Sequence, residues 1–203
     1  MTSGANKLPL VEEFFTLQGE GYHSGKAAYF IRLGGCDVGC SWCDSRFAWN
    51  PELHPMISTD VIIENVVKSG TDSAVVTGGE PLMWNLDYLC TGLKNNNIST
   101  FIETSGAYPA SGAWDWICLS PKRNMPPVGD ICKKANELKV IIQDRMDFEW
   151  AEKYRRMVPD GCRLYLQPEW SRFERIIPYI VGYIKENPVW RISLQIHKYM
   201  HIP

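Results

Sequence analysis

The 203-residue sequence lacks several features that would place it in a common class of protein. It has no uninterrupted apolar run of membrane-spanning length, which argues against a transmembrane segment. Its acidic and basic residues nearly cancel, at a formal charge of −2, so nothing indicates bulk binding of nucleic acid. It has no internal repeat and no low-complexity tract. We therefore expect a single globular domain over residues 1–203.

A disulfide framework is also missing. The seven cysteines cannot all pair with one another, and the amino-terminal segment lacks the long apolar core of a secretory signal. Both absences favour a cytoplasmic protein in which thiols stay reduced and metals can bind them. Four cysteines are scattered singly and are expected to be small apolar core residues, namely Cys90, Cys118, Cys132 and Cys162.

The other three cysteines, Cys36, Cys40 and Cys43, are spaced C-x-x-x-C-x-x-C and have no adjacent fourth. An iron–sulfur cube has four irons, so three thiolates leave one iron open to another ligand. A structural zinc site takes four protein ligands, and here His23 or Asp37 would have to supply the fourth. The local motif alone leaves an open [4Fe-4S] cluster and a zinc site as alternatives.

Runs of apolar and β-branched residues predict seven strands, and helical patterns lie between several of them. Such alternation favours parallel pairing and an α/β architecture. The predicted strands cover 27–33, 73–76, 100–102, 116–119, 138–142, 163–166 and 191–194. One predicted helix is capped by Thr59 or Asp60 and ends at Gly70, and others cover 86–95, 148–157 and 173–186, the last interrupted by Pro178. Residues 121–130 are predicted to form a loop.

Polar and glycine-rich segments follow the predicted strands. Because the carboxyl ends of parallel strands meet at one edge of the sheet, where barrels build their active sites, these segments predict a site there. They are Gly34-Gly35-Cys36, Thr77-Gly78-Gly79-Glu80-Pro81, Glu103-Thr104-Ser105-Gly106, Ser120-Pro121-Lys122, Gln167-Pro168 and Gln195-Ile196-His197-Lys198.

The cysteine loop followed by Gly78-Gly79-Glu80-Pro81 resembles the radical S-adenosylmethionine (SAM) superfamily. Glycines let backbone groups approach a ligand closely. In that superfamily the open iron chelates SAM, and an aromatic residue at the position of Trp42 lies near the adenine.

A longer series of motifs resembles the 7-carboxy-7-deazaguanine synthase family, the ring-contracting enzymes of queuosine and 7-deazapurine biosynthesis. The match runs from Phe14 to Pro203. Besides the two motifs above, it comprises Leu17-Gln18-Gly19-Glu20-Gly21, Asp44-Ser45, Glu103-Thr104-Ser105-Gly106, Ser120-Pro121-Lys122, Leu166-Gln167-Pro168, Leu194-Gln195-Ile196-His197-Lys198 and a terminal Ile-Pro. The order and spacing of these motifs, rather than any one of them, carry the resemblance.

The resemblance implies an incomplete, TIM-like radical SAM barrel with about six core parallel strands, few helices and one further strand at the edge. It implies a carbon–nitrogen lyase that contracts the ring of 6-carboxy-5,6,7,8-tetrahydropterin to 7-carboxy-7-deazaguanine with loss of ammonia. The cofactors implied are a [4Fe-4S] cluster, SAM and Mg2+. The partners implied are an external one-electron reductant, such as flavodoxin or ferredoxin, and a second copy of the chain in a homodimer, without nucleic acid or membrane.

The resemblance also implies roles for individual residues. Cys36, Cys40 and Cys43 hold the cluster, and Ser45 stands at a magnesium position where a hydroxyl oxygen suits that hard cation. The residues at SAM positions are Trp42, Gly79, Glu80, Ser105, Ser120, Pro121, Lys122, Gln167, Pro168, Glu169 and Trp170. The residues at substrate positions are Leu17, Gln18, Gly19, Arg32, Thr77, His197 and the carboxylate of Pro203. Lys139 lies within a predicted strand and either reaches the ligand or extends to solvent. No dedicated catalytic base is evident.

Two alternative functions remain on the sequence alone. An activase of a glycyl-radical enzyme would share the cysteine loop and the Gly-Gly-Glu-Pro motif, but it would not need Gln18, Arg32 and His197 to converge. A zinc-stabilised binding module would use the cysteines without catalysis.

Overall fold

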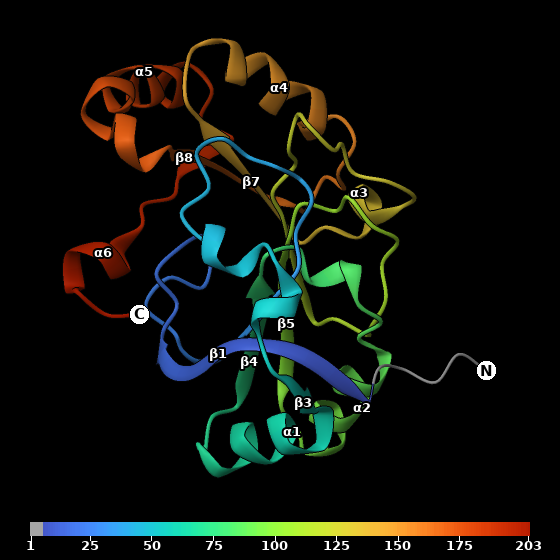
Figure 1. The fold of residues 1–203 in the computed structure, drawn as a ribbon. Coiled ribbons are helices and arrows are strands. Elements are labelled where there is room, and N and C mark those ends of the chain that lie inside the picture. The colour runs from blue at the N-terminus through green and yellow to red at the C-terminus, as the bar shows by residue number, and fades with distance from the viewer. Residues whose placement is uncertain (1–5) are drawn as a thin grey trace.

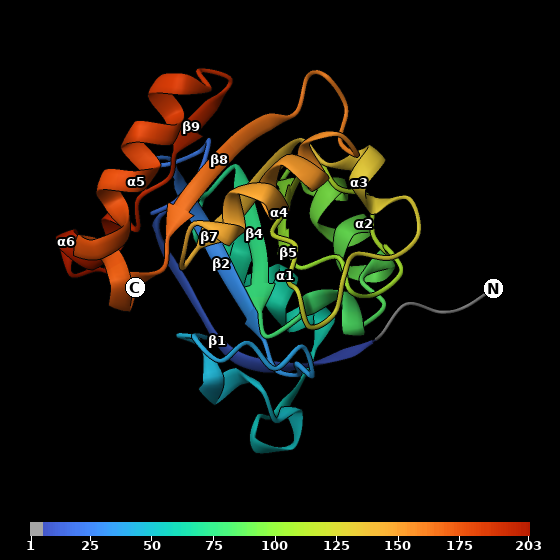
Figure 2. The ribbon, with the colours of Figure 1, turned by 90° about the horizontal axis from the view of Figure 1, so that it is seen from above.

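The computed structural model describes residues 6–203 as a nine-stranded sheet in the order β3-β1-β2-β4-β5-β6-β7-β8-β9. Seven adjacent strands run parallel, which confirms the predicted α/β class. They are β2 (Ala27–Leu33), β4 (Ser73–Gly78), β5 (Ser99–Thr104), β6 (Trp116–Leu119), β7 (Glu137–Ile142), β8 (Arg163–Pro168) and β9 (Trp190–Ile192). The strand β9, only three residues long, is the expected strand at the edge. The sheet is open, and seen from above its strands follow a curved course (Figure 2).

Two antiparallel strands were not predicted. The strand β1 (Lys7–Leu17) pairs antiparallel with β2, and β3 (Met56–Ser58) pairs antiparallel with β1. The neighbouring charges Glu12 and Glu13 interrupt the apolar pattern of β1, and a register shift falls between Leu10 and Glu12. The local sequence pattern therefore gives a weak strand signal there, and pairing with β2 stabilises the strand conformation.

The helices are α1 (Thr59–Lys68), α2 (Asp87–Asn95), α3 (Ile131–Lys134), α4 (Met146–Arg155), α5 (Phe173–Glu186) and α6 (Ile196–Met200), with single 3-10 turns η1 (Arg46–Ala48), η2 (Pro51–Leu53), η3 (Pro81–Met83) and η4 (Trp170–Arg172). The helices α1 to α5 lie on the outer side of the sheet, whereas α6 lies near the carboxyl terminus of the chain (Figures 1 and 2). The predicted helix 173–186 is confirmed with Pro178 inside it, because Ile176 and Ile180 are buried on its inner face.

Three predicted boundaries are wrong. The cap of α1 is Ser58 rather than Thr59 or Asp60. The helix α4 starts and ends two residues before the predicted 148–157. The last strand ends at Ile192, so Ser193 and Leu194 lie in a loop before α6. Residues 121–130 form the predicted loop.

Alternation along the strands separates two environments. On β7, Leu138, Val140 and Ile142 belong to the main hydrophobic core, which the sheet shares with the helices. Lys139 and Ile141, on the opposite face, line a cavity inside the curve of the sheet. Because side chains alternate with a period of two, each parallel strand can bury an apolar row and still direct polar groups to the concave side.

Candidate functional site

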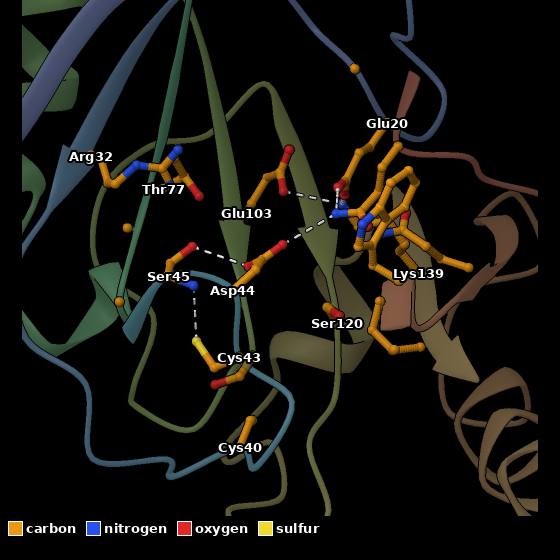
Figure 3. A pocket seen from close by; sticks show the side chains of 18 of the residues that line it. Glu20, Arg32, Cys40, Cys43, Asp44, Ser45, Thr77, Glu103, Ser120 and Lys139 are labelled. Carbon is orange, nitrogen blue, oxygen red and sulfur yellow. Dashed lines mark hydrogen bonds and ion pairs between the residues drawn. The ribbon is translucent and has the colours of Figure 1, made fainter. Parts of the chain in front are cut away.

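A cavity of about 480 Å3 opens at the carboxyl ends of the parallel strands. Thr77 lies near the end of β4, Glu103 near the end of β5, Ser120 directly after β6, and Gln167 near the end of β8. Figure 3 shows Cys40 and Cys43 at one end of this pocket and Glu20, Glu103 and Lys139 at the other, with Asp44 and Ser45 between them. The site therefore lies at the edge that the sequence predicted.

The loop with the three cysteines forms one wall of the cavity. Cys36, Cys40 and Cys43 are all half-buried, and all three line the pocket. The loop is closed on itself, since the N–H of Gly35 donates to the carbonyl of Ala48 at 2.7 Å and the N–H of Cys36 donates to that of Trp49 at 3.0 Å. Three thiols from one short loop are thereby presented to one space.

The Sγ atom of Cys43 accepts two hydrogen bonds. The backbone N–H of Ser45 and the indole Nε1 of Trp49 each lie 3.4 Å from it. Burial raises the pKa of the thiols of Cys36 and Cys40. A positively charged metal centre would overcome that effect, because thiolates are the form that binds metal.

The Gly-Gly-Glu-Pro segment lies against the cysteine loop. The N–H of Glu80 donates to the carbonyl of Gly35 at 2.8 Å. A Cβ atom on Gly79 would lie 2.3 Å from the oxygen of Gly35 and 2.8 Å from Cβ of Cys36, so no larger residue fits. Gly78 has a φ of 136°, a conformation that only glycine adopts readily. The backbone of this segment therefore packs directly against the cysteine loop, and a ligand at the cysteines could also contact it.

The carboxylate of Glu80 is buried within the protein. It accepts hydrogen bonds from the backbone N–H groups of Leu82 at 3.0 Å and Ser105 at 2.7 Å, and from the hydroxyls of Thr104 and Ser105. In this structure Glu80 therefore ties the turn after β4 to the turn after β5, and the Ser105 hydroxyl is used in the same network.

A zinc site is not supported by the ligands around the cysteines. Within residues 6–203, no three His, Cys, Asp or Glu side chains are grouped to hold a single metal ion. The carboxylate of Asp37 accepts a hydrogen bond from Tyr108 at 2.6 Å. The ring of His23 stacks on Phe101, with centroids 4.6 Å apart, and lies edge-on to Trp116. Three thiols without a fourth ligand fit an open iron–sulfur cluster instead.

The opposite end of the cavity is a buried charged cluster. The Nζ of Lys139 forms ion pairs with Glu20 and, at 3.1 Å, with Glu103. Burial alone would raise the pKa of Glu20, but Lys139 and a hydrogen bond from Gln195 lower it to about 2. Burial alone would lower the pKa of Lys139, but the two carboxylates raise it well above its usual value. We call Glu20, Glu103 and Lys139 the charged floor.

Gln18 connects this charged floor to the strand β1. Its Nε2 donates to Glu103 at 2.9 Å, and its Oε1 accepts from the N–H of Glu20 at 3.0 Å. Lys139 is buried rather than extended to solvent. Arg32 also faces the cavity, and its Nε donates to Glu12 at 2.7 Å.

The carboxyl-terminal segment covers one side of the cavity. Asp44 accepts hydrogen bonds from Gln195 and Lys198, both at 3.3 Å, and from the hydroxyl of Ser45 at 3.2 Å. His197 packs directly on Gly19, where a Cβ atom would lie 2.2 Å from its Nδ1, and burial lowers its pKa. These contacts hold α6 between the β1–β2 turn and the cysteine loop.

Two aromatic rings at the rim of the cavity each make a cation–π contact with a lysine. The Nζ of Lys122 lies 5.1 Å from the ring centroid of Trp42 and donates to the hydroxyl of Ser120 at 2.5 Å. The Nζ of Lys198 lies 4.6 Å from the ring of Trp170. Burial lowers the pKa of Lys122. The rim therefore combines flat apolar faces with cationic donors, which suits a nucleoside bearing a carboxylate.

Nearly all of the predicted site residues line this one cavity. The exception is Pro121, whose carbonyl accepts a hydrogen bond from Trp150 at 3.3 Å and which does not face the pocket. The sequence assigned no role to several other lining residues: Glu20, Asp44, Glu103, Gln195 and Lys198. The signal for Glu20 and Glu103 was their place in motifs at strand ends, and their pairing with Lys139 requires the strand order.

Comparisons with known proteins give a consistent result. The family model of a 4Fe-4S single cluster domain matches residues 17–107, which include the cysteine loop and the Gly-Gly-Glu-Pro segment. A 7-carboxy-7-deazaguanine synthase from Flavobacterium psychrophilum is 57% identical over 97% of this chain and 93% of that protein. One from Synechocystis is 47% identical over 96% of this chain and 93% of that protein.

A solved structure is also similar to this chain. The crystal structure of QueE from Escherichia coli superposes with a TM-score of 0.80 at 30% identity, and the match covers 93% of each chain. The similarity in fold therefore extends well beyond the segment that carries the cysteines.

Proposed function

Because the chain belongs to the 7-carboxy-7-deazaguanine synthase family, whose members are enzymes of the radical SAM type, we propose that it forms 7-carboxy-7-deazaguanine from 6-carboxy-5,6,7,8-tetrahydropterin. The reaction releases ammonia and makes the enzyme a carbon–nitrogen lyase. The observation that carries the proposal is one cavity with three cysteine thiols at one end and the charged floor at the other. A glycyl-radical activase has no need of such a floor.

Cys36, Cys40 and Cys43 would hold a [4Fe-4S] cluster, which supplies the electron that cleaves SAM and begins the radical chemistry. Because the loop offers three thiols to four irons, one iron would have no protein ligand. We propose that SAM extends from there along the rim past Gly79, Ser105, Ser120, Gln167 and the ring of Trp42, all of which line the cavity. Lys122 would place its cationic donor beside the adenosine.

We call the loop of residues 36–49 the cysteine wall. The pterin would lie between this wall and the charged floor. Its ring presents adjacent N–H donors, which carboxylates such as Glu103 and Glu20 can accept. Lys139 forms ion pairs with both carboxylates and fixes their position. The guanidinium of Arg32, whose Nε donates to Glu12, lines the cavity and suits the substrate carboxylate.

We also propose the remaining contacts of the site. They are Leu17, Gln18, Gly19, Thr77, His197 and Pro203 at the substrate, Pro168, Glu169 and Trp170 at SAM, and Mg2+ at Ser45. Supporting the magnesium site, the Ser45 hydroxyl lies 3.2 Å from the carboxylate of Asp44, and magnesium prefers oxygen ligands, with water and substrate completing its shell.

At the level of the cell, we propose a single-domain cytoplasmic enzyme that works as a homodimer and receives electrons from a flavodoxin or ferredoxin. Exposed apolar side chains such as Phe15, Phe47, Leu53 and Met56 support a self-association surface. No helix of residues 6–203 is long and apolar enough to cross a membrane.

The test is anaerobic reconstitution with iron and sulfide, followed by incubation with the carboxytetrahydropterin, SAM, Mg2+ and a reductant. Mass spectrometry should identify 7-carboxy-7-deazaguanine. Cys40→Ser should abolish product, whereas Cys162→Ser, a half-buried thiol outside the cavity, should form it normally. A colourless protein that binds zinc, or a reduced cluster with no deazaguanine product, would reject the proposal.

A further inference from the structure

Trp49 bridges two of the three cysteines of the loop. Its carbonyl accepts the N–H of Cys36 at 3.0 Å, and its indole Nε1 donates to the Sγ of Cys43 at 3.4 Å. The first contact belongs to the backbone and fixes the main chain of Trp49 beside Cys36. The second directs a side-chain N–H at a sulfur that the proposed function makes an iron ligand.

The environment of the indole strengthens it as a donor. The guanidinium carbon of Arg46 lies 5.6 Å from the centroid of the Trp49 ring. A cation over an aromatic face is attracted by its electrons and withdraws density from the ring, which makes the N–H more acidic. Arg46 is itself held by a hydrogen bond to the carbonyl of Ser41 within the cysteine loop.

We propose that Trp49 raises the reduction potential of the iron–sulfur cluster by hydrogen-bonding to the thiolate of Cys43. Reduction of the cluster adds one electron from the external donor and no proton, so the sulfur ligands become more negative. An N–H group directed at one of them stabilises the reduced form more than the oxidised form. The inference rests on the proposed function in one respect, that Cys43 is a cluster ligand.

The measurement is an anaerobic potentiometric titration of the reconstituted protein, followed by the electron paramagnetic resonance signal of the reduced cluster. Trp49→Phe keeps a ring and removes the N–H. We expect its midpoint potential to fall by about 59 mV, which is a tenfold lower ratio of reduced to oxidised cluster for a one-electron couple. Arg46→Gln should shift the potential in the same direction by less.

Trp84→Phe is the matched control. Its indole also donates a hydrogen bond beside the cysteine loop, but to the carbonyl of Gly34 at 2.8 Å rather than to sulfur. We expect its midpoint potential to match that of the unaltered protein. Equal shifts in the two variants would indicate a general loosening of the loop and would overturn the inference.

A second variant covers the case in which Trp49→Phe fails to hold a cluster. Site-specific replacement of Trp49 by benzothienylalanine exchanges the N–H for sulfur and keeps the shape of the ring. It should lower the potential and shift the iron–thiolate stretching bands in resonance Raman spectra. Unchanged bands and potential would overturn the inference while the enzyme still made its product. An unaltered protein that binds no cluster would instead reject the proposed function, and this inference with it.

Discussion

The two ends of the cavity are built in opposite ways. The cysteine wall is one continuous segment, residues 36–49, whose three thiols are half-buried. The charged floor brings together Glu20, Glu103 and Lys139, which lie far apart in the sequence and are joined by two ion pairs. The wall needs iron to complete it, whereas the floor is complete in the folded protein. Substitutions at the floor should therefore affect folding, and substitutions at the wall should affect only chemistry.

The largest expected effect on stability comes from Lys139→Met. Removal of the buried cation leaves two like-charged carboxylates without their common counter-ion, which should cost about 3–5 kcal/mol of unfolding free energy. Urea denaturation of the apoprotein measures it. Lys68→Met removes an exposed lysine paired with Glu64 and should change stability by about 0.5 kcal/mol or less. Comparable losses in the two variants would contradict the self-contained floor.

The second prediction concerns the pH dependence of Glu20. Its folded pKa, about 2, lies below the model-peptide value of 4.5, so its contribution to stability is present above pH 4.5 and is lost as pH falls toward 2. The destabilisation caused by Glu20→Gln should therefore be a few kcal/mol at pH 7 and shrink as the pH falls. Urea denaturation at several pH values tests this, with the exposed Glu64→Gln as control. If the stability difference between Glu20→Gln and the unaltered protein did not change with pH, the ion pair with Lys139 would not be what lowers the pKa of Glu20.

Glu137 sharpens the comparison because it is a carboxylate beside the floor without its own cation contact. Its Oε2 accepts from Tyr22 and Trp116, but its Oε1 is buried without a hydrogen-bond partner, and burial raises its pKa. A raised folded pKa means that stability is lost as pH rises through it. Glu137→Gln should therefore stabilise the protein at pH 7 by about 1 kcal/mol, and little at pH 4. Thermal unfolding at both pH values checks this, and a loss of stability at pH 7 would contradict it.

The smallest effect on stability is expected at the cysteine wall. Cys40→Ala should abolish the iron–sulfur absorbance and the product, yet change the unfolding free energy of the apoprotein by less than about 1 kcal/mol. The thiol is half-buried and its loop is held by the backbone bonds of Gly35 and Cys36. Measurement on metal-free protein isolates the effect on the chain. A loss as large as that of Lys139→Met would make the two ends of the cavity alike.

The same contrast explains what the sequence could predict. The seven parallel strands were found because each is a short apolar run, and the cysteine wall was found because its ligands are adjacent in the chain. The charged floor was not found, because nothing local links Glu103 to Lys139 until the strand order brings β5 and β7 to flank β6.

The errors have similar physical causes. The strand β1 was missed because its order depends on pairing with β2. Motif spacing also does not show that the carbonyl of Pro121 accepts a hydrogen bond from Trp150. Trp49 was missed because its contact with Cys43 arises from the turn η1, which places its ring back over the loop. Motif spacing identifies ligands well, but it does not show which neighbours fold back onto them.

The two backbone hydrogen bonds that close the cysteine loop also bear on the response of the protein to oxygen. Gly35 and Cys36 are fastened to Ala48 and Trp49 by groups that contain no sulfur and no iron. Loss of the iron–sulfur cluster to oxygen should therefore leave these backbone hydrogen bonds, and the conformation of the loop, in place. Oxidative loss of the cluster should then be local and reversible. Its repair should require only iron and sulfide, without refolding of the chain.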